Sequence, residues 1–559
     1  MSGKLHEAVP VATTATHVHS SKSYASRLPV PLQRIFFVKD IDVMHAQMAT
    51  VQYKKTLTAL DLTLLGVGAI IGAGIFVLTG VAAAKHAGPA LIISFIIAGV
   101  VCALASLCYA EMGSMIPASG SAYSFTYAGL GEGLAWICGW DLMLEYMVGA
   151  ATVAVGWSHY LKNFIIQVAG EGSYDDRFFN APFKWYEVGE TKQGVELTSA
   201  QFGLKYFRCG GTLEAPEWCN SYVDLPAIAI VILVTALLVV GIRSSARVNA
   251  GLVALKVTVV IMFIFAGLKF IKNENYQPFI PENEGEKKYG VSGIFAGAVT
   301  VFFAYIGFDA VSTTAQEAKN PQRDLPIGII GSLTICTALY VAVSAVLSGL
   351  LPLSRIAEED VMNAPVAQAL YIAAQGQGVN LKWLTIIITI AAIAGLSSVI
   401  LVMLMGQPRI FAAMAADGLL PSVFAKIHPK FGTPYITTIT TGFITLLFAG
   451  LLPVDILGNL TSVGTLMAFF FVSLSCLVLK IRDPHRHRPF AIPGGKIGGI
   501  IIPVLSMAAV IVLLSQTSTA SIARVFIWMA LGVVIYLAYG YRHSKARFDP
   551  ARTLHHIDG

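Results

Sequence analysis

The chain has 559 residues, of which 55% are hydrophobic and only 13% charged, and its mean hydropathy is +0.69. Soluble domains carry roughly 25% charged residues, so this composition excludes an ordinary soluble globule and predicts that the lipid bilayer is the main solvent. The formal net charge of +6 gives no indication of a nucleic-acid partner.

The chain begins with a polar stretch. Residues 1–55 contain no uninterrupted apolar run of signal-peptide length behind a basic start, so we expect no cleaved export signal. We interpret residues 1–55 as a polar cytoplasmic arm, residues 56–541 as one helical membrane domain and residues 542–559 as a cytoplasmic tail. Residues 166–223 are the predicted long extracytoplasmic loop of that domain.

Apolar segments recur along the rest of the chain. A bilayer core about 30 Å thick needs roughly 20 apolar residues per helix, and about twelve segments approach or exceed that length. We therefore predict an all-α integral membrane protein. The segments lie at residues 60–83, 89–112, 132–165, 224–242, 248–271, 292–316, 327–351, 382–406, 434–452, 456–480, 498–515 and 521–541.

Charge in the connections predicts the orientation. Twelve spans place both termini on one side, and with that side cytoplasmic 23 Lys and Arg residues lie inside and 14 outside. Six of those 14 lie in and beside the long loop, which carries little orientation information, so the useful comparison is 23 against 8. Both termini are expected to be cytoplasmic.

Two of the apolar segments are unusual. The first, "LLGVGAIIGAGIFVLTG", contains five glycines, and glycine disfavours helix by about 1 kcal/mol relative to alanine. The sixth, "FFAYIGFDAVSTTAQE", places Gly307 and Asp309 in an apolar run, where a carboxylate must face a cavity or a partner. Close helix packing is an alternative explanation for the glycines, whereas a dinucleotide fingerprint is excluded because no βαβ context surrounds them.

The two segments occupy corresponding positions if helices 1–5 and 6–10 form two halves. Transporters built from inverted repeats place interrupted helices at such positions, where half-helix N-termini hold a substrate carboxylate and freed carbonyls accept bonds from its ammonium group. A zwitterionic amino acid suits such a site.

Over roughly residues 55–500 the sequence resembles the cationic amino acid transporter family of the amino acid, polyamine and organocation transporter superfamily. The resemblance implies two inverted five-helix repeats (1–5 and 6–10) with broken helices 1 and 6, two extra helices and alternating access. It rests on "GVGAIIGAGIFVLTG", "AGPA", "YAEMGSMIPASGSAY", "LEYMVGAA", "FFAYIGFDAVSTTAQEAKNPQRDLPIGI" and "GQPRIFAAMAADGLLP".

The resemblance also implies site residues. Backbone groups that face the substrate carboxylate are assigned to Ile70, Ala73 and Gly74. The amino-group side and the gate are assigned to Phe303, Ala304 and Ile306, and Asp309 follows the family's "GFD". The sequence departs from the family at Gln316, where many relatives have an acid. Because Gln316 lies at the cytoplasmic end, we expect this difference to change the electrostatics of the cytoplasmic gate and not substrate binding.

Lys256 lies about eight residues into the fifth segment, roughly 12 Å from its start at 1.5 Å per residue. Desolvation at that depth favours the uncharged amine. We therefore expect proton coupling through Lys256. Protonation of this lysine would replace the sodium ion that sodium-coupled relatives bind. In similar proton-coupled members of the superfamily, a helix-5 lysine is assigned this role. A permanently charged structural contact with a carbonyl of helix 1 is the alternative. No metal or cofactor is expected.

The predicted side-chain pocket contains Glu145, Asp309 and Met403. A lipid-exposed carboxylate is too costly, so Glu145 should face the interior, whereas Asp141 one turn earlier is interpreted as an interfacial helix end. The resemblance favours arginine, lysine and ornithine as substrates, whereas Met403 would shrink the pocket and favour small neutral amino acids. An amino-acid-sensing transceptor is a further alternative.

Other classes are disfavoured. The sequence has no H-E-x-x-H zinc pair and no G-x-S-x-G elbow, so an enzyme is not expected, and no repeated loop suggests the selectivity filter of a channel. Cys209 and Cys219 in the long loop could form a disulfide if the loop faces an oxidising compartment. The expected address is the plasma membrane, with the vacuolar membrane as alternative, and the oligomeric state is open.

Overall fold

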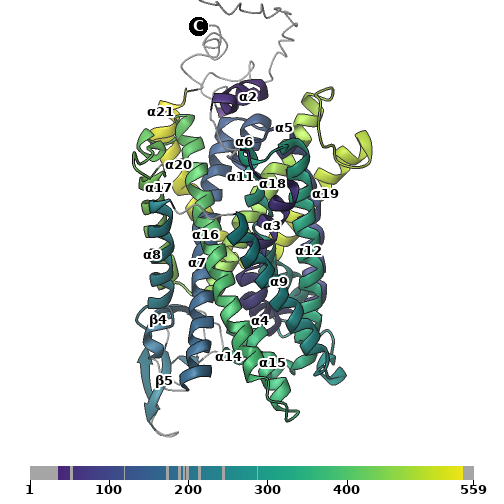
Figure 1. Ribbon diagram of the computed structural model, residues 1–559, viewed down its shortest axis with the longest axis vertical. Coiled ribbons are helices and arrows are strands. Elements are labelled where there is room, and N and C mark those ends of the chain that lie inside the picture. Colours follow the sequence, from purple (N-terminus) through teal and green to yellow (C-terminus); the bar gives the residue numbers. More distant parts are fainter. Residues whose placement is uncertain are drawn as a thin grey trace, which may run out of the picture.

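The computed structural model describes residues 35–50, 55–118, 120–170, 175–186, 191–192, 195–196, 201–204, 206–211, 216–241, 246–285, 287–431 and 433–545. Long helices stand side by side in one upright bundle (Figure 1). The helix α2 (Ile41–Thr50) and the C-terminal α21 (Tyr541–His543) lie at one end of this bundle, and the short strands lie at the other.

Eight helical stretches among the described residues are long and apolar enough to cross a membrane, as expected for a multi-pass integral membrane protein. Two further apolar helices, α8 (Leu225–Val240) and α17 (Tyr435–Leu451), are shorter. Large apolar side chains point outward from the bundle, and Phe526 and Ile527 are 66% and 71% exposed. Apolar surface on this scale is stable in lipid rather than in water. The eight stretches are Ala59–Met115, Ala250–Leu268, Gly290–Thr313, Pro321–Leu350, Lys382–Ala416, Val454–Arg482, Gly495–Gln516 and Thr519–His543.

The first half of the membrane region begins behind a capping box. The Thr58 side chain accepts a hydrogen bond from the Asp61 N–H, and the Asp61 carboxylate accepts one from the Thr58 N–H, which satisfies two donors at the helix start. The helices of this half are α3 (Ala59–Ile70), the π-helical η2 (Gly74–Leu78), α4 (Thr79–Ala82), the π-helical η3 (Ala83–Ala87), the 3₁₀ turn η4 (Gly88–Ala90), α5 (Leu91–Met115), α6 (Ala122–Gly129), α7 (Glu132–Ala169), α8 (Leu225–Val240) and α9 (Ala246–Leu268).

The rest of the membrane region contains long helices separated by short ones. Its longest members are α12 (Pro321–Leu350), which starts with proline where the missing N–H costs nothing, and α16 (Lys382–Ala416). The others are α10 (Gly290–Phe302), η7 (Phe303–Tyr305), α11 (Phe308–Thr313), η8 (Ala315–Glu317), α13 (Leu353–Ile356), α14 (Glu359–Asn363), α15 (Pro365–Gln375), η9 (Ser422–Ala425), α17 (Tyr435–Leu451), α18 (Val454–Arg482), α19 (Gly495–Gln516), α20 (Thr519–Ile535) and η10 (Tyr536–Gly540).

The long loop after α7 contains strands, which the sequence analysis did not anticipate. Three antiparallel pairs form, β1 (Phe183–Tyr186) with β4 (Gln201–Leu204), β2 (Thr191–Lys192) with β3 (Val195–Glu196) and β5 (Tyr206–Gly211) with β6 (Pro216–Asn220). Cys209 and Cys219 belong to the paired strands β5 and β6, with Phe207 opposite Cys219. Their side chains lie outside the described residues, so the disulfide stays a prediction.

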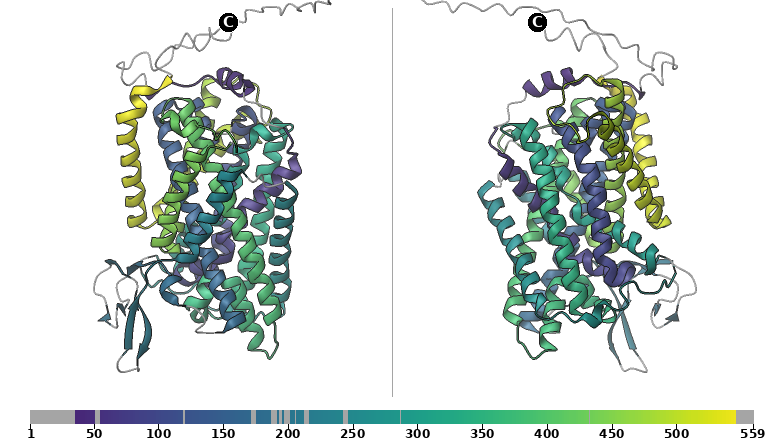
Figure 2. Two further views of the ribbon diagram at one scale, coloured as in Figure 1. Left: turned by 60° about the vertical axis from the view of Figure 1, so that its left-hand side comes forward. Right: turned by 90° about the vertical axis from the view of Figure 1, so that its right-hand side faces the viewer.

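The long helices fall into two groups. In the first, α12 packs along α5 and α3, α10 packs along α5, and α11 contacts α3 and α12. In the second, α7 packs along α16 and α18, and α17 packs along α8. The helix α20 stands at the edge of the bundle (Figure 2). The broken helices α3–η2 and α10–α11 belong to the first group and face the second through α16 and α18.

Candidate substrate and coupling site

The first membrane helix is broken where the glycine cluster predicted. α3 ends at Ile70, and Ile71 takes an extended conformation with φ −71° and ψ 96°. The chain turns helical again at Gly74. An interruption of this kind leaves carbonyls at the end of one half-helix and N–H groups at the start of the next without helical partners.

The sixth membrane helix is also interrupted. After α10 the chain forms the single turn η7, Ile306 is extended with ψ 134°, and Gly307 has φ +124° before α11 begins. That φ is strained for any residue with a Cβ, which explains the glycine. The Asp309 carboxylate, in the first turn of α11, accepts a hydrogen bond from the Gly307 N–H at 3.1 Å.

The two interruptions lie against each other. A Cβ placed on Gly74 would come within 2.1 Å of the Ala304 Cα, and one placed on Gly307 would come within 2.8 Å of the Ala69 backbone carbon. The residues predicted to face a substrate carboxylate (Ile70, Ala73 and Gly74) and those predicted to face its amino group (Phe303, Ala304 and Ile306) therefore share one buried region.

Lys256 projects from α9 onto the broken end of α3. Its Nζ donates to the carbonyl oxygens of Gly68 at 2.7 Å and Ile71 at 3.1 Å, and the residue is fully buried. In a continuous helix these carbonyls would accept from backbone N–H groups four residues later. Gly395 on α16 leaves room for the lysine stem, because a Cβ there would lie 3.0 Å from its Cγ and Cε. The contact with carbonyls of helix 1 expected for a structural lysine is thus present.

The three residues of the predicted side-chain pocket come from three helices. Glu145 on α7 is 2% exposed, shares a hydrogen bond with Thr465 on α18, and its Oε2 has no hydrogen-bond partner among the described residues. Tyr146 donates to the second oxygen of Asp309 at 2.9 Å. Met403 on α16 reaches α7 one turn from Glu145, where its sulfur lies 3.0 Å from the position of a Cβ on Gly149.

Asp309 and Glu145 differ in how many of their carboxylate oxygens are hydrogen-bonded. Both Asp309 oxygens are engaged, one by Gly307 and the other by Tyr146, whereas Glu145 keeps one acceptor oxygen in a buried position. An unsatisfied buried carboxylate oxygen is costly unless a proton or a cation reaches it. Glu145 is therefore the better placed of the two to meet an incoming group.

Asp141 does not mark an interfacial helix end. α7 already begins at Glu132, and Asp141 is 0% exposed, with neither carboxylate oxygen hydrogen-bonded among the described residues. The interpretation as a helix end was wrong, because more than two helical turns of α7 precede Asp141.

Ion pairs join the helices on either side of the region, one toward each end of the bundle. Arg409 on α16 pairs with Glu317 at 2.7 Å and donates to the Thr313 carbonyl at 3.3 Å, which joins α16 to the end of α11. At the opposite end Lys85 pairs with Asp455 at 3.0 Å, which joins η3 to α18. The residues assigned to the substrate site, which lie between these two ion pairs, are at most 5% exposed.

Several residues in contact with the site were missed by the sequence analysis. Tyr340 on α12 donates to the Ile70 carbonyl and Tyr160 on α7 to the Phe76 carbonyl, each at 2.8 Å. A buried tyrosine hydroxyl needs a hydrogen-bond partner, so tyrosines inside apolar segments were the available signal. Gln316, the expected departure in the gate, is half-buried beside Glu317, the acid that makes the ion pair.

No group of three or more His, Cys, Asp or Glu residues in the described part of the chain could hold a metal ion. The polar groups that converge here are backbone carbonyls, one ammonium and carboxylates.

Comparison with known proteins places these observations among transporters. The family described as "Amino acid permease" matches residues 57–538. The chain is 42% identical to the branched-chain amino acid permease BcaP of Bacillus subtilis over 91% of this chain and 98% of that protein. It is 38% identical to the methylthioribose transporter of the same organism, over 92% and 99%. It is 36% identical to the vacuolar cationic amino acid transporter 2 of Arabidopsis thaliana, over 80% of this chain and 63% of that protein.

Proposed function

Since the chain belongs to the amino acid permease family and is a transporter rather than an enzyme, we propose that it moves amino acids across a membrane by alternating access. The observation that carries the proposal is the contact between the two helix interruptions at Gly74 and Ala304. There the half-helix that starts at Gly74 offers N–H groups to a carboxylate, and the end of η7 offers carbonyls to an ammonium group.

We further propose twelve spans, arranged as two inverted five-helix repeats with two additional helices. The first of the eight apolar stretches contains two passes, because the chain reverses between η3 and α5 at Gly88, which has φ +56°. The helices α7, α8 and α17 supply the other three. The excess of Lys and Arg at the end that carries the termini supports cytoplasmic termini, and the plasma membrane is the proposed address.

Proton coupling is proposed through Lys256. A charged ammonium donates stronger hydrogen bonds to the carbonyls of Gly68 and Ile71 than a neutral amine does. Loss of its proton would therefore loosen the end of α3, which is the half-helix that borders the substrate region. A permanently charged lysine would make the same two contacts but would give no response to a pH gradient.

Cationic amino acids are the first candidate substrates. Glu145 keeps one carboxylate oxygen without a hydrogen-bond partner among the described residues, and an ammonium or guanidinium group on the substrate would satisfy it. The resemblance of the sequence to cationic amino acid transporters supports this choice.

Neutral, branched-chain amino acids are the second candidate. Met403 lies against α7 at Gly149, so the proposed side-chain pocket has an apolar wall next to Glu145. The full-length similarity to a branched-chain permease favours this class as well. In this case Glu145 would hold a proton or hydrogen-bond within the protein.

Uptake into proteoliposomes tests the proposal. The purified full chain is reconstituted, a pH gradient with an alkaline interior is imposed, and accumulation of labelled arginine, lysine, ornithine, leucine, valine and alanine is measured. We expect accumulation above the external concentration for one class, which also excludes a channel and a sensor without transport activity. Absence of both accumulation and counterflow for all six would overturn the proposal.

A further inference from the structure

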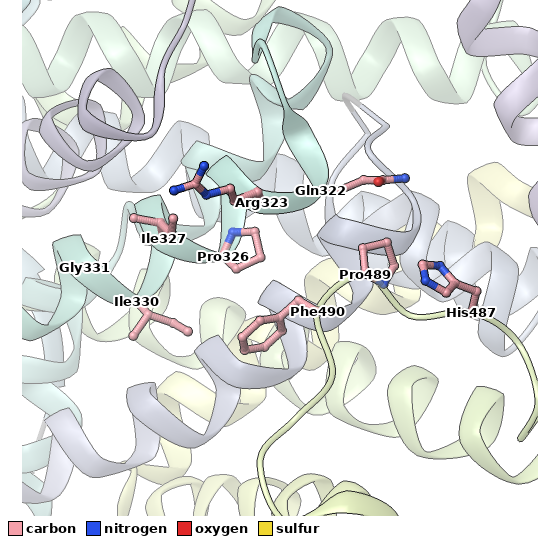
Figure 3. A pocket seen from close by; sticks show the side chains of 9 residues that line it. All are labelled: Gln322, Arg323, Pro326, Ile327, Ile330, Gly331, His487, Pro489 and Phe490. Carbon is pink, nitrogen blue, oxygen red and sulfur yellow. The ribbon is translucent and has the colours of Figure 1, made fainter.

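A cavity of about 720 Å³ lies outside the substrate region, at the end of the bundle that carries both terminal segments. Figure 3 shows its lining, with the first turns of α12 on one side and the loop after α18 on the other. Its volume is within the range of about 300–1,000 Å³ that small-molecule sites occupy. The lining residues are Gln322, Arg323, Pro326, Ile327, Ile330, Gly331, His487, Pro489 and Phe490.

The polar side chains of the cavity are Gln322, Arg323 and His487. None of the three makes a side-chain hydrogen bond or ion pair with a residue that the structure describes, and no lining residue is acidic. Neighbouring cations differ in this respect, because Arg486 pairs with Asp42 at 2.6 Å. The cavity thus presents hydrogen-bond donors and a positive charge without an internal counterion.

The other side chains are apolar and lead into the membrane. Ile327 is 43% exposed, and Ile335, two turns further along α12, is 44% exposed. These eight residues of helix extend about 12 Å. A ligand with an anionic head and a hydrocarbon tail matches this arrangement. The hydrogen-bond donors of the cavity lie at the end of α12, and the exposed isoleucines continue along α12 toward the bilayer core.

Both walls of the cavity are anchored to α5. α12 packs along α5, and the loop wall is held by the Phe490 N–H, which donates to the Ser114 hydroxyl at 3.2 Å. Glu111 accepts from the Ile492 N–H at 2.8 Å and pairs with Lys480 at 2.8 Å. Because these contacts fix the loop, a ligand would not have to order it on binding, which lowers the entropic cost.

We propose that this cavity binds an anionic glycerophospholipid, with the lipid phosphate at Arg323 and His487 and one acyl chain along Ile327 and Ile330. Basic pockets beside membrane helices on the cytoplasmic side are typical sites for such head groups. The assignment to the cytoplasmic leaflet rests on the proposed topology, whereas binding itself depends on neither topology nor transport. The lipid would join α12 to the loop that precedes α19.

Thermal unfolding of the purified full chain in a zwitterionic detergent tests the proposal. Phosphatidylglycerol is titrated against phosphatidylcholine with the same acyl chains, and the midpoint shift gives an apparent affinity. We expect stabilisation by phosphatidylglycerol only. Removal of one interfacial charge in Arg323→Gln should weaken the apparent affinity about fivefold. Lys430→Gln, which removes an exposed charge at the same end of the bundle, should leave the affinity unchanged.

Two further arms identify the ligand. Glycerol phosphate and inorganic phosphate, which lack acyl chains, should give no comparable shift, and Ile327→Ser should weaken phosphatidylglycerol binding. Equal affinities in Arg323→Gln and the wild type, an equal loss in Lys430→Gln, or full stabilisation by glycerol phosphate would each overturn the proposal. Substrate uptake by the same preparations is scored separately, so a failure of lipid binding and a failure of the transport proposal are distinguishable.

Discussion

Lys256 takes the place of backbone donors that the break in the first helix removes. Two buried carbonyls, those of Gly68 and Ile71, depend on its Nζ. An unsatisfied buried acceptor costs about 1–3 kcal/mol, so the protonation state of one side chain can alter the stability of the half-helix end. This dependence distinguishes Lys256 from a lysine that merely fills space.

Replacement of Lys256 by methionine tests the coupling role. Methionine keeps an unbranched apolar stem but carries no proton, so we expect Lys256→Met to lose accumulation driven by a pH gradient and to retain substrate counterflow in proteoliposomes. The matched control is Lys269→Met, at an exposed lysine directly after the end of the same helix, which should behave as the wild type. Accumulation that still follows the pH gradient in Lys256→Met would contradict proton coupling at this residue.

Replacement of Glu145 tests which of the two proposed substrate classes the protein transports. Glu145→Gln keeps the shape of the side chain and removes its charge. Hydrogen bonds to charged groups contribute about 1.5–3 kcal/mol, so transport of arginine and lysine should fall by roughly 10–150-fold in kcat/KM, and leucine transport should be unaffected. The exposed Glu282→Gln serves as control. Unchanged arginine transport in Glu145→Gln would exclude the charge as a specificity determinant.

At the scale of elements, the two interrupted helices form one unit. Gly74 lies on Ala304, and Gly307 lies on Ala69, so each break contacts the other without intervening side chains. Residues at both contacts are buried, and packed backbones of this kind shift together rather than independently. The fit of the two half-helix ends should therefore be sensitive to added volume at either contact.

An added methyl group at this contact tests the close approach. Gly74→Ala would place a Cβ 2.1 Å from the Ala304 Cα, and overpacking typically costs about 1–3 kcal/mol. We expect a lower midpoint of thermal unfolding in detergent and strongly reduced uptake. Gly251→Ala in α9, where a Cβ would meet no atom within 4 Å, should unfold no earlier than the wild type. Equal midpoints in the two variants would mean that the breaks separate freely.

The sequence predicted these elements unequally well. The glycine cluster was enough to predict the break in the first helix, because helix propensity depends on residues that are neighbours in the sequence. It could not show that Gly74 faces Ala304 or that Tyr340 reaches the Ile70 carbonyl, because those contacts join distant segments. The strands of the long loop were missed for a related reason, since each is short and its pairing partner determines it.

At the scale of the whole molecule, the arrangement of charge and apolar surface defines how the protein lies in the membrane. α19 and α20 carry strongly exposed apolar side chains, whereas Arg486 and Asp42 pair at the end that carries the termini. The sequence predicted the membrane class and the order of the helices from composition and hydropathy. It could not predict how α16 and α18 contact the broken helices, because several faces of these helices are apolar.

Impermeant labelling checks the proposed orientation. Single cysteines are introduced in place of Glu282 and Lys430, which are exposed at opposite ends of the bundle, in a background with Cys209 and Cys219 replaced by serine. In intact cells we expect a membrane-impermeant maleimide to label Glu282→Cys and not Lys430→Cys, with both labelled after permeabilisation. Labelling of Lys430→Cys alone in intact cells would reverse the proposed topology.

Under the proposed proton coupling, the single Lys256 ammonium would also limit how steep a gradient the protein can build. One ammonium would exchange one proton per cycle, so a single proton would accompany each substrate molecule. A neutral amino acid could then be concentrated about tenfold for each unit of pH difference, since a tenfold ratio corresponds to 1.4 kcal/mol, with the membrane potential adding to this limit. Transport of a cationic substrate with one proton would move two charges across the membrane, whereas transport of a neutral substrate would move one. The maximum concentration ratios of lysine and leucine would therefore diverge as the membrane potential rises.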